Sequence, residues 1–366
     1  MSPLPKKAQA VTVSLKDLQN GTVPFSTLEE AFGPSSLGIL VVRSLPSSFP
    51  SLRSRVLSSA SYLAHLPQSK LDALTRPDAK YLVGWSHGVE TLRPGVVDIL
   101  KGSYYINCAF HTDPTLQCAP PPFVEYTTPN IWPPLRDFQT ATTELCNLMI
   151  STAALVARAC DQYATQKIPS YTPKNLLENV VRTSTTTKAR LLHYFPPAHV
   201  KSNSPTPAQT SIQKSQDGWC ATHVDHGCLT ALTSAMLIDE STTLIPALEP
   251  NQPLTPLPEL NTNPSPNAGL YIRSRSGSIT KIDIPKDCLA FQTGEALESM
   301  TKGRFKAVPH FVRGADGEEG EGIARNTLVV FTQPNLEVEV EEGGVSFGEF
   351  ARRIVDRNTA GRGVGV

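Results

Sequence analysis

Two short segments of the sequence hold a histidine and an aspartate separated by one residue: "HTDPT", which begins at His111, and "HVDHG", which begins at His223. Side chains two positions apart on an extended chain point to the same face, so an imidazole and a carboxylate can reach one metal ion. Non-haem iron(II) oxygenases hold their metal with two histidines and one carboxylate. Each segment is therefore a candidate for two ligands of such a site, and a third ligand must come from elsewhere.

The first pair stands at the edge of a proline-rich stretch. Pro114 follows Asp113 directly, and further prolines continue to Pro134. Aspartate in such a position commonly accepts hydrogen bonds from the backbone two residues on and closes a turn. We therefore predict that His111 and Asp113 form a surface turn, with Asp113 capping local backbone groups, and do not bind a metal.

The second pair has suitable partners downstream. His310, in "RFKAVPHFV", is the only histidine after His226 and lies on a strand-like pattern, which makes it the candidate for the third ligand. Arg325 and Thr327 are two positions apart in "RNTLVVF" and also share a face of a strand. An arginine fork beside a hydroxyl is suited to binding a carboxylate through two hydrogen bonds.

These segments carry a resemblance to a known family. "HVDHGCLTAL", "TKGRFKAVPHFV" and "RNTLVVFTQP" resemble the His-x-Asp, distal histidine and Arg-x-Ser segments of the iron(II)/2-oxoglutarate dioxygenases of the isopenicillin N synthase-like family. "LLHYFPP", at 191–197, resembles the Asn-Tyr-Tyr-Pro-Pro segment of the same family. The four motifs occur in the family's order, and the resemblance covers most of the chain.

The resemblance implies a set of site residues and an activity. His223, Asp225 and His310 would bind Fe(II), and Arg325 and Thr327 would hold the distal carboxylate of 2-oxoglutarate with help from the hydroxyl of Tyr194. The activity implied is hydroxylation or desaturation of a small-molecule substrate by molecular oxygen, with release of succinate and CO2. The alternatives are a non-haem iron oxidase of the same fold that does not use 2-oxoglutarate, and a scaffold that binds metal or metabolite without catalysis. A zinc hydrolase is less favoured, because no HExxH motif is present.

The sequence departs from the family pattern in a few places. The proline-rich segment 240–267 lengthens the interval between His223 and His310, and we expect it to form a surface insertion or a lid. A loop rich in glycine and acidic residues, 314–322, precedes Arg325. Thr327 replaces the family's serine but keeps its hydroxyl. His193 stands where the family has asparagine, a position from which it could face substrate, and we expect it to have a structural role.

The surrounding sequence predicts an α+β protein. A proline-free stretch from Leu135 to Lys167 carries one apolar stripe and predicts the longest helix, while short strand-like runs separated by polar turns follow residue 185. The resemblance implies a double-stranded β-helix (jelly-roll) core. We expect a mainly helical N-terminal region at 1–184, the catalytic core at 185–335 and a C-terminal tail helix at 336–366.

Composition narrows the partners and the compartment. The 366 residues include 33 basic and 33 acidic ones, without the basic stripe of a nucleic-acid or membrane-surface binder. The seven cysteines include no CxxC pair, which favours a reducing compartment over a disulfide framework. The first residues lack the apolar core of a secretory signal, and no apolar run is long enough to cross a bilayer. We therefore expect a cytoplasmic protein that binds a small molecule.

Overall fold

A computed structural model describes residues 6–93, 96–121, 123–197, 218–246, 252–274, 276–315, 320–341 and 343–359. Most of the strands belong to two sheets. The larger sheet has nine strands, in the order β2 (Val11–Ser14), β3 (Ile39–Arg43), β14 (Leu289–Thr293), β10 (Leu229–Thr233), β16 (Ile323–Thr332), β8 (Lys188–Tyr194), β7 (Lys101–Asn107) and β4 (Gly84–His87), with β11 (Met236–Asp239) also paired to β16.

The smaller sheet has five strands, in the order β1 (Lys6–Ala8), β13 (Ile279–Ile282), β12 (Gly269–Arg273), β15 (His310–Arg313) and β9 (Cys220–His223). Two short hairpins stand apart, β5 (Thr91–Arg93) with β6 (Val96–Val97) and β17 (Glu339–Glu341) with β18 (Val345–Ser346). The strand-rich second half of the chain is thus as the sequence predicts. The first half also adds four strands to the larger sheet, beside its helices.

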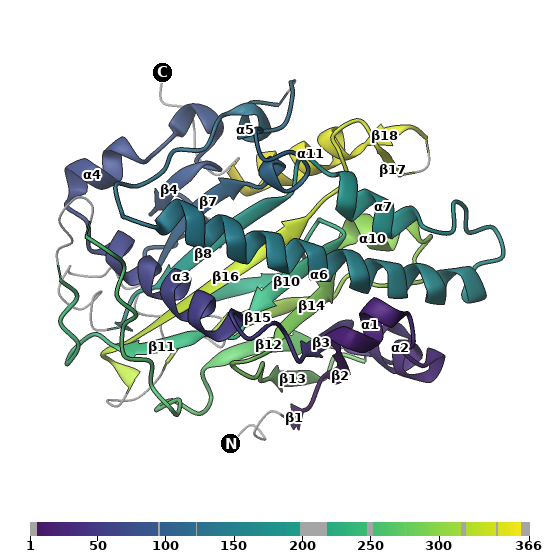
Figure 1. Ribbon diagram of the computed structural model, residues 1–366, viewed down its shortest axis with the longest axis horizontal. Helices are drawn as coiled ribbons and strands as arrows, with labels where there is room; N and C mark the ends of the chain where they lie inside the picture. The colour runs from purple at the N-terminus through teal and green to yellow at the C-terminus, as the bar shows by residue number, and fades with distance from the viewer. Residues whose placement is uncertain are drawn as a thin grey trace.

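Helices cover one face of the larger sheet. The longest, α6 (Phe138–Lys167), runs across it in Figure 1, and both α6 and α3 (Phe49–Ala64) contact β16. The other α-helices in the described residues are α1 (Leu15–Asn20), α2 (Phe25–Phe32), α4 (Gln68–Ala73), α5 (Val124–Thr127), α7 (Leu176–Thr183), α10 (Glu295–Met300) and α11 (Phe347–Thr359). None of the helices in the described parts of the chain has the length and hydropathy needed to span a bilayer.

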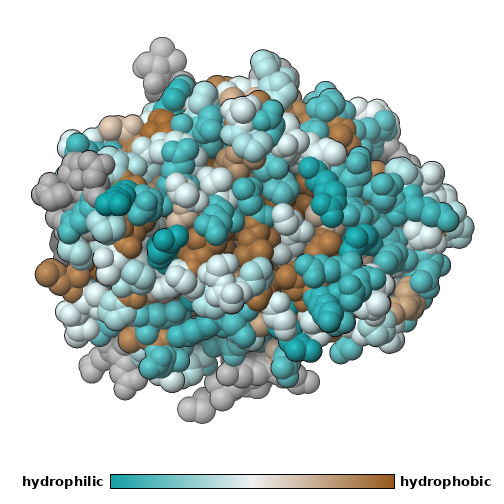
Figure 2. Space-filling model, in the orientation of Figure 1, coloured by the Kyte–Doolittle hydropathy of each residue, from teal (hydrophilic) through white to brown (hydrophobic). Residues whose placement is uncertain are grey.

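The predicted long helix is confirmed, with a later start. It begins at Phe138 because Asp137, which precedes it, adopts a left-handed conformation with φ of 63°. The apolar stripe faces the sheet, where Leu145, Met149 and Val156 are fully buried. On the outer surface of the same face of the molecule, hydrophilic residues surround small hydrophobic groups (Figure 2), which is ordinary for a folded protein.

Two predicted strands have different bounds in the structure. The run 229–238 is divided into β10 and β11, because the carbonyls of Ser234 and Ala235 turn away to accept hydrogen bonds from Arg53. The run 304–312 becomes strand only at His310, since Pro309 lacks an N–H group for the sheet and a turn at Gly303 precedes it. The later start places His310 at the first position of β15.

The register of β16 decides which side chains face the inside. Arg325 pairs with Tyr194 and Thr327 pairs with Leu192 on β8. Because side chains alternate along a strand, Arg325, Thr327 and Tyr194 lie on one face, and the neighbouring pair of Asn326 and His193 lies on the other, toward α3.

The two segments expected to depart from the family are only partly described. Within 240–267, residues 247–251 lie outside the described residues, and within 314–322 the same holds for 316–319. In the described residues 252–267 of the first segment, Glu259 forms ion pairs with Arg53 at 2.9 Å and with Lys286 at 3.3 Å. This part of the insertion is therefore anchored to α3 and to the turn after β13.

Candidate metal centre

Strand pairing brings the three predicted ligands together. β9 ends at His223 and β15 begins at His310, and these two residues are direct partners across the small sheet. Asp225 follows in the next loop, with its oxygens 3.6 Å from His223 Nε2 and 3.7 Å from His310 Nε2. Among the residues that the structure describes, only these three place metal-ligating atoms within 4.8 Å of one another.

Neighbouring groups orient each of the three side chains. His223 Nδ1 lies 2.8 Å from the Ala221 carbonyl, and His310 Nδ1 lies 3.1 Å from the Val308 carbonyl. Since a carbonyl can only accept, His223 Nδ1 carries a proton, and loss of the second proton leaves the Nε2 lone pair facing the centre. His310 Nδ1 lies between an acceptor, the Val308 carbonyl, and a donor, Gln292 Nε2 at 2.8 Å, so only the His223 tautomer follows from these contacts. Thr230 Oγ1 donates to Asp225 Oδ2 at 2.7 Å. These contacts are the outer-layer hydrogen bonds that orient metal ligands, so the residues fit a divalent cation.

The charges at the centre are arranged around Asp225. Burial alone would raise the pKa of this carboxyl, but His310 and His223 outweigh it and hold the pKa below its usual value. Burial also opposes the charged form of His223, yet Cys220 and Asp225 raise its pKa to about 9. The pKa of His310 is lowered, chiefly by burial. The carboxylate is therefore ionised at neutral pH and available to a metal ion.

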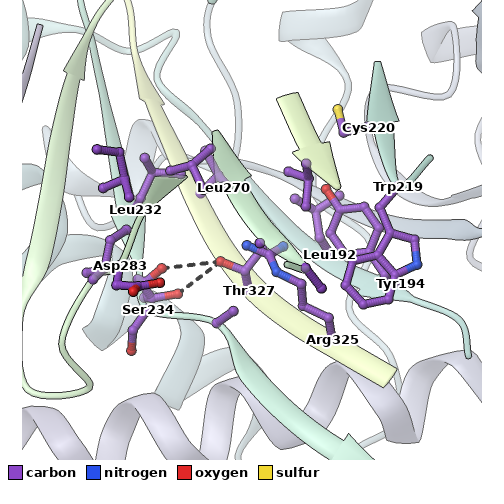
Figure 3. A pocket seen from close by; sticks show the side chains of 18 of the residues that line it. Leu192, Tyr194, Trp219, Cys220, Leu232, Ser234, Leu270, Asp283, Arg325 and Thr327 are labelled. Atoms are coloured by element: carbon purple, nitrogen blue, oxygen red, sulfur yellow. Dashed lines mark hydrogen bonds between the residues drawn. The ribbon is translucent and has the colours of Figure 1, made fainter. Parts of the chain in front are cut away.

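The centre opens into a cavity of about 490 Å³ between the two sheets. Arg325, Thr327 and Tyr194 line the same cavity, and Figure 3 shows them projecting from neighbouring strands. Arg325 is only 8% exposed, and its Nη1 is buried without a hydrogen-bond partner among the described residues. A buried guanidinium in this state fits an anionic ligand, because charge-assisted hydrogen bonds would offset the cost of its desolvation.

Tyr194 and Thr327, the other two residues expected near the distal carboxylate of 2-oxoglutarate, lie in different surroundings. The Tyr194 ring lies 5.2 Å from the Arg325 Cζ atom, and burial raises the pKa of its hydroxyl to about 12, so the group stays protonated and able to donate. Thr327 Oγ1 lies 3.3 Å from Thr233 Oγ1 and donates to the Thr233 carbonyl at 3.4 Å (Figure 3). Its contacts with β10 are long and leave the hydroxyl on the cavity wall.

The first histidine–aspartate pair forms a turn, as predicted. Asp113 Oδ1 accepts hydrogen bonds from the Thr115 N–H and hydroxyl, both at 2.8 Å. His111 Nδ1 lies 3.3 Å from Asn147 Oδ1 on α6. The two side chains are thus committed to separate local contacts, and Asp113 caps the backbone of its own turn.

Some residues of the centre were not found from the sequence. Gln292, on β14, has its amide nitrogen 2.8 Å from His310 Nδ1, and Thr230 holds Asp225. Neither belongs to a motif, and their contacts arise only when β14 and β10 lie beside the ligands. The expectation of a structural role for His193 agrees with its place on the helix side of β8, where Nδ1 lies 2.8 Å from Asn326 Oδ1.

Comparisons with known proteins identify the fold. No model of a known protein family matches the chain, and no curated protein matches its sequence. Solved structures do match. A full-length Neurospora crassa protein, crystallised in complex with alpha-KG, is 17% identical, with a TM-score of 0.63 over 94% of this chain and 95% of that one. A 2OG-Fe(II) oxygenase family protein from Caulobacter crescentus is 17% identical, with a TM-score of 0.64 over 95% and 98%.

A plant enzyme gives the same result. AtDAO1, the dioxygenase for auxin oxidation 1 from Arabidopsis thaliana, in complex with 2-oxoglutarate, is 15% identical, with a TM-score of 0.55 over 93% of this chain and 96% of that one. The chain therefore has the mixed α/β fold of the 2-oxoglutarate/iron(II) oxygenases over nearly its whole length.

Proposed function

We propose that the protein is an Fe(II)/2-oxoglutarate-dependent oxygenase that hydroxylates or desaturates a small-molecule substrate. One observation carries the proposal: the triad lines a single cavity with the buried Arg325, whose Nη1 has no hydrogen-bond partner among the described residues. Metal ligands alone would suit many sites. A metal site that shares its cavity with a buried guanidinium group suits a co-substrate that has a chelating group at one end and a carboxylate at the other.

The residues have distinct roles in this proposal. His223, Asp225 and His310 would hold Fe(II), and Arg325 would bind the distal carboxylate of 2-oxoglutarate. Tyr194 and Thr327 would add hydroxyl donors at that end, since both line the cavity beside Arg325. Iron with 2-oxoglutarate would supply the oxidising chemistry, reducing molecular oxygen while 2-oxoglutarate becomes succinate and CO2. The chain itself orients the two ligands.

The arrangement of the strands and of the regions of the chain is part of the proposed function. We propose that β8–β16 form a double-stranded β-helix within 185–335, supported by the region 1–184 and closed by the tail 336–366. The inward face of β16 then carries Arg325 and Thr327 in the same way that β9 and β15 carry the histidines. We place the enzyme in the cytoplasm, in keeping with its seven free cysteines.

The substrate belongs to the small-molecule class. A cavity of about 490 Å³ lies in the range of small-ligand pockets. The Neurospora crassa protein has also been solved in complex with alpha-KG and thymine, and JOX2 in complex with 2OG, Fe and JA, so proteins of this fold hold small organic molecules beside the co-substrate. The balanced charge of the chain argues against a nucleic-acid substrate.

The test is turnover of 2-oxoglutarate to succinate by the Fe(II)-loaded protein, with and without oxygen. Even without the proper substrate, we expect slow oxygen-dependent succinate formation that is lost in Asp225→Ala and kept in Asp113→Ala. Oxygen consumption without succinate would favour an oxidase that does not use 2-oxoglutarate. Iron binding with neither product would favour a non-catalytic scaffold.

A further inference from the structure

A second, largely buried arginine lines the cavity at a distance from Arg325. Arg190 lies on the inward face of β8 and pairs with Val329 of β16, while Tyr194, on the same face of β8, pairs with Arg325. The two pairs are four residues apart, which is about 13 Å along the strands. A co-substrate that binds to the metal centre and to Arg325 therefore leaves Arg190 to a second molecule in the same cavity.

Neighbouring side chains hold the guanidinium group of Arg190 in place. Its Nη2 and Nε donate to Ser103 Oγ at 2.8 Å and 3.0 Å, and Nη2 also donates to Glu90 Oε1. The group lies over the Tyr105 ring, 4.8 Å from its centroid. None of the described residues accepts a hydrogen bond from Nη1. Nη1 is therefore the donor that Arg190 offers to the cavity, and its position is set before a ligand arrives.

The two arginines of the cavity differ in their counter-charges. Glu90 forms an ion pair with Arg190, and its second carboxylate oxygen lies 3.1 Å from Lys101 Nζ. Lys101 Nζ is also 2.8 Å from Asp98, so two cations and two carboxylates cancel in this cluster. Among the described residues, no carboxylate pairs with Arg325. The uncompensated Arg325 favours an anion, whereas the compensated Arg190 favours a neutral hydrogen-bond acceptor.

We propose that Arg190 Nη1 donates to a carbonyl oxygen of a neutral substrate and positions that substrate in the cavity. The wall around Arg190 is apolar. Leu192 is the next inward residue on β8, and Val329 and Leu232 follow across β16 and β10. Figure 3 shows Leu192 and Leu232 among the side chains of this cavity. The substrate class is thus an uncharged, largely apolar molecule that carries an amide, lactam or ketone oxygen. The inference rests on the proposed function and adds to it a substrate class and a positioning residue.

The test measures the binding of matched probes to the full-length protein in the presence of Zn(II) and 2-oxoglutarate. The probes are phenylacetamide with phenylacetate, and indole-3-acetamide with indole-3-acetate, so each pair differs only in its amide or carboxylate. Ligand-observed NMR gives the Kd of each probe. We expect the wild type to bind the amide of at least one pair about tenfold more tightly than the carboxylate, because only the amide leaves the charges of the cluster balanced.

Two substitutions separate the role of Arg190 from the role of its charge balance. Arg190→Leu should weaken amide binding about 10- to 150-fold, while the affinity for 2-oxoglutarate, measured by calorimetry, stays unchanged. Glu90→Gln keeps an oxygen for the Tyr105 hydroxyl, which donates to Glu90 at 2.8 Å, but removes the carboxylate that compensates Arg190. Carboxylate binding should then rise roughly tenfold. Asp113→Asn is the matched control and should change neither affinity, and circular dichroism confirms that each variant is folded.

The outcomes distinguish this inference from the proposed function. Tighter binding of the carboxylates by the wild type, no binding of any probe, or the same amide affinity in Arg190→Leu would overturn the inference, even if 2-oxoglutarate binds normally. An amide preference that Arg190→Leu removes, in a protein that calorimetry shows not to bind 2-oxoglutarate, would support the role of Arg190 and contradict the proposed function.

Discussion

The two histidine–aspartate pairs have the same spacing in the sequence but different surroundings in the structure. His111 ends a short 3-10 helix, and Asp113 turns back to Thr115, so the pair serves its own loop. His223 ends a strand whose partner brings His310 directly opposite, and Asp225 turns toward both. The spacing of two side chains therefore does not define a metal site. What distinguishes the second pair is the pairing of β9 with β15, which brings a third candidate ligand, His310, beside it.

The largest expected difference between the pairs lies in metal binding. Asp225→Ala removes the carboxylate between the two imidazoles and should lower Fe(II) or Mn(II) affinity at this centre on the order of 100-fold or more, beyond the loss expected for an outer-layer group. Asp113→Ala should leave the affinity unchanged. Anaerobic calorimetric titration measures both, and a similar loss in the two variants would contradict the assignment.

The next effect concerns the anion-binding end of the cavity. Arg325→Ala should weaken 2-oxoglutarate binding about 10- to 150-fold, because charge-assisted hydrogen bonds contribute about 1.5–3 kcal/mol. Metal affinity should stay within about twofold, since Arg325 contacts none of the three ligands. Arg325→Lys serves as the control that keeps the charge but loses the fork. Equal co-substrate affinity in all three proteins would remove Arg325 from the site.

Smaller losses of metal affinity are expected when the residues that contact the ligands are substituted. Thr230→Val removes the hydroxyl that donates to Asp225, and Gln292→Leu removes the amide beside His310. Each should lower metal affinity about 10- to 100-fold while the fold persists. Thr115→Val is the matched change at the first pair, where the hydroxyl donates to Asp113, and it should have no effect on metal binding.

Metal affinity at the second pair should also depend on pH. The metal needs the deprotonated His223, whose pKa is raised to about 9, so each metal ion bound below that pH displaces a proton. Affinity should rise about tenfold per pH unit from pH 7 toward pH 9 and then level off. The His223 ring is 43% exposed, so high salt should weaken this dependence of metal affinity on pH. A flat profile in the same range would contradict the raised pKa.

Much of the centre could be read from the sequence because strand periodicity is local. The alternation that puts Arg325 and Thr327 on one face, and the positions of His223 and His310 on strand-like runs, need no knowledge of distant contacts. Gln292 and Thr230 could not be found in this way, because their roles depend on which strands become neighbours. The break between β10 and β11 depends on Arg53, which lies far away in the chain.

The most direct test of the central claim is an anaerobic titration of the Fe(II)-loaded protein with 2-oxoglutarate, followed through the visible charge-transfer band of the chelate. The wild type and His111→Ala should develop the band, Asp225→Ala should not, and Arg325→Ala should need far more 2-oxoglutarate to reach it. A wild type that binds iron without developing the band, or a band that survives in Asp225→Ala, would contradict the assignment of His223, Asp225 and His310 as the iron site of a 2-oxoglutarate-dependent oxygenase.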